Sequence, residues 1–318
     1  MRRLTPGFFA KRLLMLVPTW VGISVVVFSL LHLIPGDPAT VILGMMATPE
    51  QREAVLSNLG LDKPLFAQFF GWLGSVVSGD LGNSVINGQP VAEQIVNRTG
   101  PSLELVLMAV SLSVVVGVPF GVWTATHPGR FVNFIVHGIS LLGLSIPTFL
   151  LGSLLIVLGS RVAKDVQMIG YIPFAEDPVA SVRVMFWPAL TLALALLAIV
   201  VRYTREAMAS VLGSDYMMTA RAMGVPRRAL VYKNAFRNSL VPMIGAVGAQ
   251  VAYLVGGAVV VETVFAIPGI GTLTLSAIDQ RDYPVLQGIV LVVATGVIVV
   301  NLLVDLLYVV VDPRMADA

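Results

Sequence analysis

The chain has 318 residues, of which 57% are hydrophobic and only 12% charged, and its formal net charge is +2. A water-soluble domain of this length has no means of burying so much apolar surface, so the composition indicates a protein whose solvent is lipid. The absence of cysteine excludes disulfides, thiolate metal sites and a cysteine nucleophile. The three histidines, His32, His127 and His137, lack the spacing of metal ligands, so we expect no metal site.

Six apolar stretches have the length of about 20 residues that a helix needs to cross the hydrocarbon core. They cover residues 13–34, 103–125, 134–159, 185–201, 239–261 and 285–311. The first has the basic start of a signal peptide, but its apolar run is long and Pro35 follows it, so we expect an uncleaved anchor. Glycines recur within the stretches and predict close helix packing, at Gly117 with Gly121, Gly245 with Gly248, and Gly256 with Gly257.

The distribution of Lys and Arg predicts the orientation of these spans. Most of the 20 basic residues fall in the segments that are cytoplasmic if the amino terminus is inside. Both termini are therefore expected in the cytoplasm. We divide the chain into residues 1–101, an anchor helix with an external region, and residues 102–318, a five-helix core.

The external region holds two predicted helices. Thr48 and Pro49 have the character of an N-cap and a first helical residue, and Gly60 would end that helix. A second helix over residues 64–77 has a broad apolar face. Two interpretations stay open for it: a helix on the outer membrane surface, or a helix packed on the ends of the spans.

A hydrophilic segment, residues 202–238, separates the fourth span from the fifth. Ser214 or Asp215 can cap a short helix through Ala222, Gly224 permits a turn with positive φ, and Pro226 opens a further helix to residue 238. A helix held between two spans would act as a lever, because force on it tilts both. The alternative is a basic loop that only sets the topology.

Short motifs give these elements a family resemblance. Met218-Thr219-Ala220-Arg221-Ala222-Met223-Gly224 resembles the Glu-Ala-Ala-x-x-x-Gly loop of permease subunits in bacterial binding-protein-dependent ABC importers. The chain looks like a first permease of the dipeptide and oligopeptide branch. In this chain, Met218 and Met223 stand where that branch usually has basic residues. Further matching motifs are Ile34-Pro35-Gly36-Asp37-Pro38, Gly79-Asp80-Leu81-Gly82, Pro268-Gly269-Ile270-Gly271, Arg281-Asp282-Tyr283-Pro284 and Asp312-Pro313-Arg314.

The resemblance implies an all-α, six-helix type I importer permease in the bacterial plasma membrane, which transports and is not an enzyme. Its expected partners are a second permease, two cytoplasmic ATPase subunits that carry ATP and Mg²⁺, and an extracytoplasmic peptide-binding protein. No cofactor and no nucleic acid are expected on this chain, which lacks a Gly-x-x-x-x-Gly-Lys-Ser/Thr phosphate loop. Peptide, glutathione and nickel-chelate substrates stay open. The expected ATPase-coupling residues are Asp215, Tyr216, Thr219, Ala220, Arg221, Ala222 and Gly224.

Polar residues within the spans are candidates for the pathway or its gate. They are Gln250, Tyr253, Glu262, Asn301 and Asp305. Asp305 can pair with a basic residue such as Arg202, gate the pathway, or couple protons. Gln250 can equally form a helix–helix hydrogen bond, and for Glu262 we favour a solvated charge at a span end over a contact with a peptide amino terminus.

Two other classes of protein fit less well. An ion-coupled secondary transporter usually shows internal repeats, and none is evident. An intramembrane hydrolase could use Ser140 or Ser145 near His137, but the sequence offers no oxyanion-hole loop.

Overall fold

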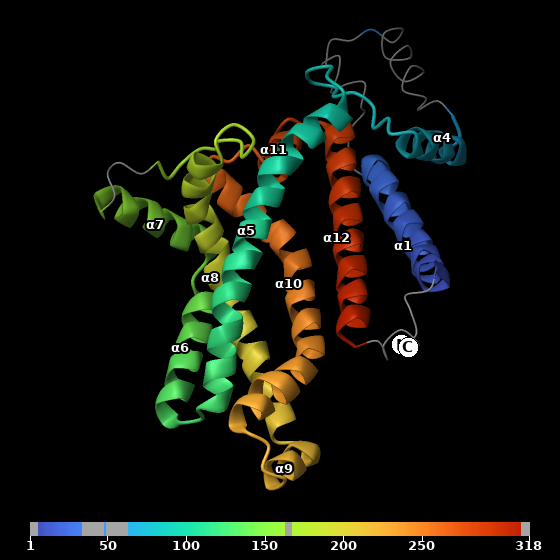
Figure 1. Ribbon diagram of the computed structural model, residues 1–318. Coiled ribbons are helices and arrows are strands. Elements are labelled where there is room, and N and C mark those ends of the chain that lie inside the picture. Colours follow the sequence, from blue (N-terminus) through green and yellow to red (C-terminus); the bar gives the residue numbers. More distant parts are fainter. Residues whose placement is uncertain (1–5, 34–47, 49–62, 163–166, 313–318) are drawn as a thin grey trace. The chain divides into compact units, whose positions relative to one another are not determined.

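The computed structural model describes residues 6–33, 48, 63–162 and 167–312 (Figure 1). In this part of the chain all regular elements are helices, and the one β-type feature is an isolated bridge between Asn83 and Pro90. The helices are α1 (Pro6–Leu33), α4 (Leu65–Val77), α5 (Val91–Thr126), α6 (Arg130–Ser145), α7 (Thr148–Val162), α8 (Pro178–Leu212), α9 (Asp215–Ala222), η1 (Ala229–Phe236), α10 (Arg237–Val264), α11 (Ile270–Asp279) and α12 (Tyr283–Val311).

The described residues form two compact units. The larger falls within Met1–Phe9, Pro101–Gly271 and Val299–Ala318, and the smaller within Ala10–Gly100 and Thr272–Ile298. The helices α5 and α12 each contribute one end to each unit. The division at residue 101 that we drew from the sequence stays a prediction.

Helix α8 is the centre of the larger unit. It packs against α6, α7 and α10, and its side chains Met185, Leu192 and Leu196 are fully buried. Helix α5 approaches α8 closely, because a Cβ added at Gly117 would lie 2.9 Å from Cγ1 of Val200. The predicted role of this glycine in helix packing is confirmed.

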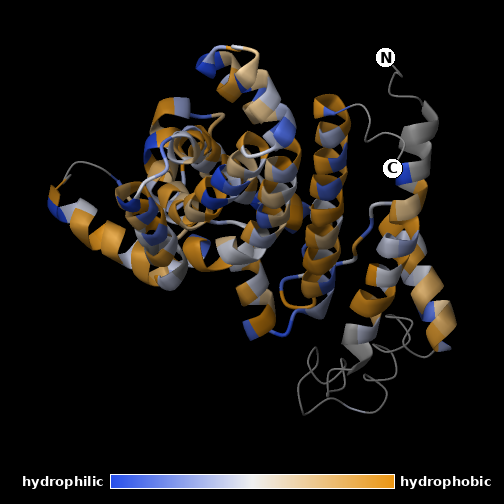
Figure 2. Cartoon of the chain, turned by 90° about the horizontal axis from the view of Figure 1, so that it is seen from below, coloured by the Kyte–Doolittle hydropathy of each residue, from blue (hydrophilic) through white to orange (hydrophobic). Residues whose placement is uncertain are grey.

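Only part of the predicted set of spans appears as long single helices. In the described residues, α5, α8 and α12 are long and apolar enough to cross a membrane. Hydrophobic residues make up most of the surface of the helices in Figure 2. The predicted fifth span is a bent pair, since the helix turns by 52° beside Gly256. No atom of the described residues lies within 4 Å of a Cβ built at Gly256 or Gly257, so the packing role of this pair, which lies beside the bend, stays a prediction.

The predicted third span is wrong as a continuous helix. Helix α6 ends at Ser145 and α7 begins at Thr148. Pro147 has no N–H to donate and disfavours the helical conformation for the residue before it, so the break has a local cause. The predicted fourth span is too short, since α8 runs past the apolar stretch to Leu212.

The smaller unit joins α1, α4 and one end of α12. The indole N–H of Trp20 donates to Thr295 over 3.1 Å, and the buried hydroxyl of Ser84 donates to the carboxylate of Asp282. The helix predicted to run from Thr48 to Gly60 lies almost wholly outside the described residues.

Candidate functional site

The hydrophilic segment between α8 and α10 folds into the predicted short helix and turn. Helix α9 starts after Ser214, and Gly224 follows it with φ +77°. Ser214 occupies the N-cap position, but its hydroxyl donates to the carbonyl of Val211 over 2.6 Å and makes no side-chain cap. The predicted helix and glycine turn are therefore confirmed, while the predicted capping bond is not formed.

One buried side chain holds α9 against the ends of the long helices. Met217 is 1% exposed and belongs to an apolar cluster with Met208 of α8, Leu230 and Ala235 of η1, and Val122 of α5. A peripheral hydrogen bond supports it, from the amide of Asn238 to the hydroxyl of Tyr216 over 2.9 Å. This cluster connects α9 to the ends of α5 and α8 and to η1.

The segment from Ala229 to Phe236 is a π-helix, whereas an ordinary α-helix was expected from residue 226 to 238. It runs directly into α10 at Arg237. The hydroxyl of Ser239 donates to Sδ of Met208 over 3.1 Å, which joins the start of α10 to α8. Long π-helical stretches are rare and concentrate at functional sites. This one connects α9 and the turn at Gly224 to α10, which holds the predicted fifth span.

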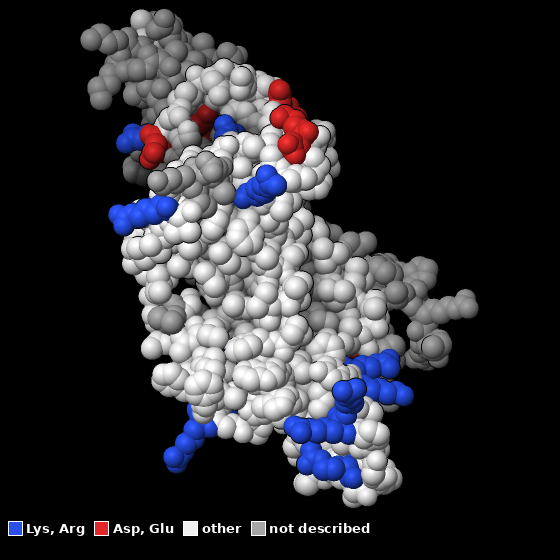
Figure 3. Space-filling view, turned by 60° about the vertical axis from the view of Figure 1, so that its left-hand side comes forward, with Lys and Arg blue, Asp and Glu red and all other residues white. Residues whose placement is uncertain are grey.

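The outer face of the segment is exposed and mixes apolar with basic side chains. Tyr216, Met218, Met223 and Tyr232 expose 49%, 56%, 74% and 65% of their surface. Lys and Arg gather over the same end, as Figure 3 shows. The exposed basic residues are Arg221, Arg227, Arg228, Lys233 and Arg237. A grouped apolar surface rimmed by charge is typical of a protein interface.

The predicted coupling residues fall on this segment. Ala220 is half-buried against the apolar cluster. The other predicted coupling residues are exposed, namely Asp215, Tyr216, Thr219, Arg221, Ala222 and Gly224. The sequence-based set omitted Met217, the residue that anchors α9. An apolar residue within a hydrophilic segment was the available signal, but the sequence offered no means of choosing the buried one among the three methionines between residues 215 and 224.

The candidate pathway residues are spread over α10 and α12. Tyr253 is 77% exposed, Gln250 and Asp305 are half-buried, and Asn301 is exposed. The two helices touch nearby, since Val304 lies against Gly248. The Nε atom of Arg202 lies 4.0 Å from Oε1 of Glu206. The pairing of Arg202 with Asp305 stays a prediction. The pathway roles of the candidates on α10 and α12 named in this paragraph stay predictions too.

Glu262 contradicts the expectation of a solvated charge, because it is 1% exposed. Its carboxylate accepts a hydrogen bond from the hydroxyl of Ser102 over 2.5 Å and another from the N–H of Gly271 over 2.7 Å. Ser102 also accepts from the N–H of Ile270 over 2.8 Å. A Cβ at Gly269 would collide with the carboxylate. The carboxylate thus joins α5, α10 and the start of α11 in one junction.

The loop before α8 packs near this junction. The N–H of Gly170 donates to the carbonyl of Phe265 over 2.8 Å, and the hydroxyl of Tyr171 donates to Glu104 over 3.1 Å. Burial, the hydrogen bond to Glu104 and the negative charges of Glu104 and Glu176 raise the pKa of Tyr171 to about 12. Tyr171 therefore stays a neutral donor at any physiological pH.

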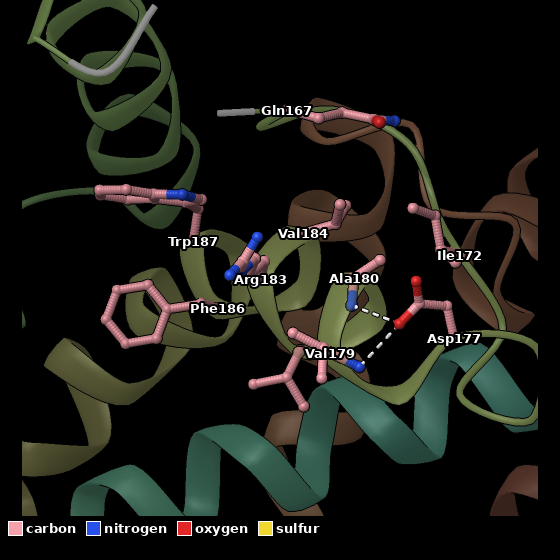
Figure 4. Close-up of a pocket in the computed structure, with 10 residues that line it drawn as sticks. Gln167, Ile172, Asp177, Val179, Ala180, Arg183, Val184, Phe186 and Trp187 are labelled. Atoms are coloured by element: carbon pink, nitrogen blue, oxygen red, sulfur yellow. Dashed lines mark hydrogen bonds between the residues drawn. The ribbon is translucent and has the colours of Figure 1, made fainter. Parts of the chain in front are cut away.

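A shallow groove of about 600 Å³ lies beside the same loop (Figure 4). Its lining includes Gln167, Ile172 and Trp187, with Arg183 as the cation. Asp177 accepts hydrogen bonds of 3.0 Å from the N–H groups of Val179 and Ala180, which satisfies the first turn of α8. The lining of the groove is mostly apolar. The N–H groups of Val179 and Ala180 already donate to Asp177, so they are not open to a ligand. Among the described residues, no three His, Cys, Asp or Glu side chains gather as a metal site.

Comparison with known proteins finds relatives that are similar to this chain in sequence and in structure. A family model described as a binding-protein-dependent transport system inner membrane component matches residues 117–317, and the model of the corresponding N-terminal region matches residues 6–106. The dipeptide transport system permease protein DppB of Escherichia coli K12 is 39% identical over 97% of this chain and 98% of its own.

Two more relatives match over the same share of both chains. They are the probable peptide ABC transporter permease protein y4tP of Sinorhizobium fredii, at 36% identity, and the glutathione transport system permease protein GsiC of Escherichia coli K12, at 38%. A chain of the inward-facing MetNI methionine ABC transporter superposes with a TM-score of 0.56 at 18% identity, covering 69% of this chain and 96% of its own.

The structural likeness confirms the type I importer permease fold, and the sequence likeness extends over both units. The chain is thus a multi-pass inner membrane protein with a transport role. It belongs to the family of binding-protein-dependent transport system inner membrane components.

Proposed function

We propose that the chain is the membrane-spanning permease subunit of an ATP-driven importer of dipeptides or oligopeptides. The observation that carries this is the match to DppB over nearly the whole of both chains. GsiC matches almost as well, and glutathione is itself a small peptide. The shared substrate class is therefore a short peptide, and the permease pathway need only accept a peptide backbone with varied side chains.

The coupling segment gives the proposed complex its mechanical link. Two cytoplasmic ATPase subunits, which bind ATP and Mg²⁺, would contact the exposed face around Met218 and Met223. Met217 would pass a movement of α9 to Met208 on α8, and η1 would pass it to α10. A helix bundle with two arrangements then opens alternately to either side as ATP shifts their populations. A second, homologous permease would form the other half of the pathway.

The charge distribution supports one orientation in this proposal. The basic coupling end lies in the cytoplasm, both termini share that side, and the region before α5 faces outward. An extracytoplasmic peptide-binding protein would deliver the substrate there. We assign no cofactor to this chain.

Cross-linking tests the coupling interface directly. The chain has no cysteine, so Met223→Cys introduces a unique thiol on the exposed face of the coupling segment. Val179→Cys is a matched control, since Val179 is 62% exposed at the other end of α8. We expect a bifunctional reagent to join the ATPase to the thiol at 223 and not to that at 179. Cross-linking at 179, or at neither position in the assembled complex, would contradict the proposed interface.

A further inference from the structure

Helix α4 of the smaller unit has three distinct faces. Side chains advance by about 100° per residue around a helix, so positions three and four apart share a face. The first face carries Phe69, Trp72 and Val76, the second carries Phe66, Phe70 and Val77, and the third carries Ala67, Gly71 and Ser75 beside Gln68. The helix contains no charged residue.

The first face packs on α1. The ring of Phe28 lies 5.4 Å from that of Phe69 and 5.9 Å from that of Trp72, measured between centroids. Helix α1 ends at Leu33, about 7 Å farther along its axis at 1.5 Å per residue. Helix α4 therefore crosses α1 close to the carboxyl end of that helix.

Helix α1 itself needs lipid around it. Leu14, Met15 and Val26 expose 72%, 58% and 60% of their surface to the outside of the unit. A family member that spans the inner membrane exposes such a stripe to acyl chains. The contact at Phe28 then places α4 near the boundary between hydrocarbon and headgroups.

The second face of α4 is largely exposed in the part of the chain that the structure describes. Phe66 is 81% exposed, Phe70 64% and Val77 74%. Water contact with this surface costs about 25 cal/mol for each Å². The face also has no charge or hydrogen-bonding group with which a protein partner would set its orientation, whereas acyl chains require neither.

The third face is turned by about 120° around the helix from the second, and it is small and polar. Gln68 folds back, and its amide donates to the carbonyl of Lys63 over 2.7 Å. Ser75 and Gly71 are exposed. Water can therefore cover this face without leaving apolar surface wet.

We propose that α4 lies in the plane of the membrane beside the end of α1, with Phe66, Phe70 and Val77 inserted among lipid acyl chains. The polar face then points to water, and Phe69 and Trp72 fix the helix to α1. In this proposal the first apolar face packs on the end of a span, and the second lies on the membrane surface. Each face therefore fits one of the two interpretations that the sequence left open. The inference rests on the membrane-spanning role of the chain and, for the outer leaflet, on the proposed topology.

Spin labels at single cysteines measure this arrangement. Phe66→Cys and Val77→Cys report on the second face, and Ala67→Cys and Ser75→Cys are matched controls on the third face of the same helix. Each full-length variant is labelled with a nitroxide in lipid nanodiscs. The accessibility of the label to membrane-soluble oxygen and to a water-soluble nickel chelate is then measured.

We expect labels at 66 and 77 to show several-fold greater accessibility to oxygen than to the nickel chelate, and labels at 67 and 75 to show the reverse. Equal accessibility to the chelate on both faces would overturn the proposal. Protection at 66 and 77 that appears only when a peptide-binding protein is added would also overturn it, in favour of a protein-docking face. Val77→Cys removes little volume, so it remains informative if Phe66→Cys is poorly folded. Neither outcome depends on which solute is transported.

Discussion

The two ends of the larger unit are held together by different chemistry. At the coupling end, α9 is fixed mainly by the apolar contact of Met217 with the ends of α5, α8 and η1. At the other end, the buried carboxylate of Glu262 binds donors from α5 and from the start of α11, with glycines packed against it. Apolar contacts tolerate sliding, whereas hydrogen bonds to a carboxylate require fixed distances and angles. The first end suits a part that moves, and the second suits a fixed junction.

Breaking the polar junction should have the largest effect on stability. In Glu262→Ala, the hydroxyl of Ser102 and the N–H of Gly271 lose their acceptor and a cavity remains, which should lower the free energy of unfolding by about 4 kcal/mol. Thermal unfolding of the purified protein in nanodiscs measures it. Thr263→Ala, an exposed neighbour, is the control and should change stability by less than about 0.5 kcal/mol. If both variants unfold alike, the carboxylate does not hold the junction.

Removing the apolar anchor should weaken only the coupling end. Met217→Ala should destabilise the packing of α9 by about 2 kcal/mol, seen as faster hydrogen exchange in α9 while α8 near Met185 stays protected. ATP-driven uptake should fall with it. Met218→Ala, at a position 56% exposed, should leave exchange in α9 unchanged and weaken ATPase binding instead. Identical exchange in the two variants would show that Met217 is no anchor.

The turn after α9 should show a smaller effect. Gly224 has φ +77° and no atom within 4 Å of an added Cβ, so Gly224→Ala tests backbone conformation alone. The left-handed conformation should cost alanine about 1 kcal/mol. Gly129→Ala is matched, since Gly129 has equal space and lies outside the left-handed region. Equal loss of uptake in both variants would remove the turn from the coupling mechanism.

The smallest effect is expected at the hydrogen bond between Tyr216 and Asn238. Tyr216→Phe should lower stability by about 0.5 kcal/mol, because both side chains are exposed and water replaces the lost bond. A double-mutant cycle with Asn238→Ala measures the coupling energy between them. A coupling energy above about 1.5 kcal/mol between the two side chains would mean that the end of the larger unit that holds α9 also depends on polar contacts.

Sequence reasoning located the elements whose signals are local. Helix α9 and the turn at Gly224 follow from a capping position and a glycine, and the spans α5, α8 and α12 follow from length and hydropathy. The break at Pro147 also had a local signal, but the apolar run around it dominated the prediction. The π-helix had none, since Ala229–Phe236 has the composition of an ordinary helix.

The burial of Glu262 depends on residues distant in the chain. Ser102 lies 160 positions away, and no periodicity within α10 reports on it. The same holds for Met217, whose burial depends on where α5 and η1 lie. The sequence alone therefore did not predict which side chains tertiary packing buries.

Transport by reconstituted vesicles tests the central claim most directly. Uptake of a labelled dipeptide is measured with the complete set of partner subunits, with the ATPase omitted, and with this chain alone. We predict accumulation against a gradient only when the partners, ATP and Mg²⁺ are all present. Uphill accumulation by this chain alone would contradict the account, since it would show that the energy source does not act through the coupling segment.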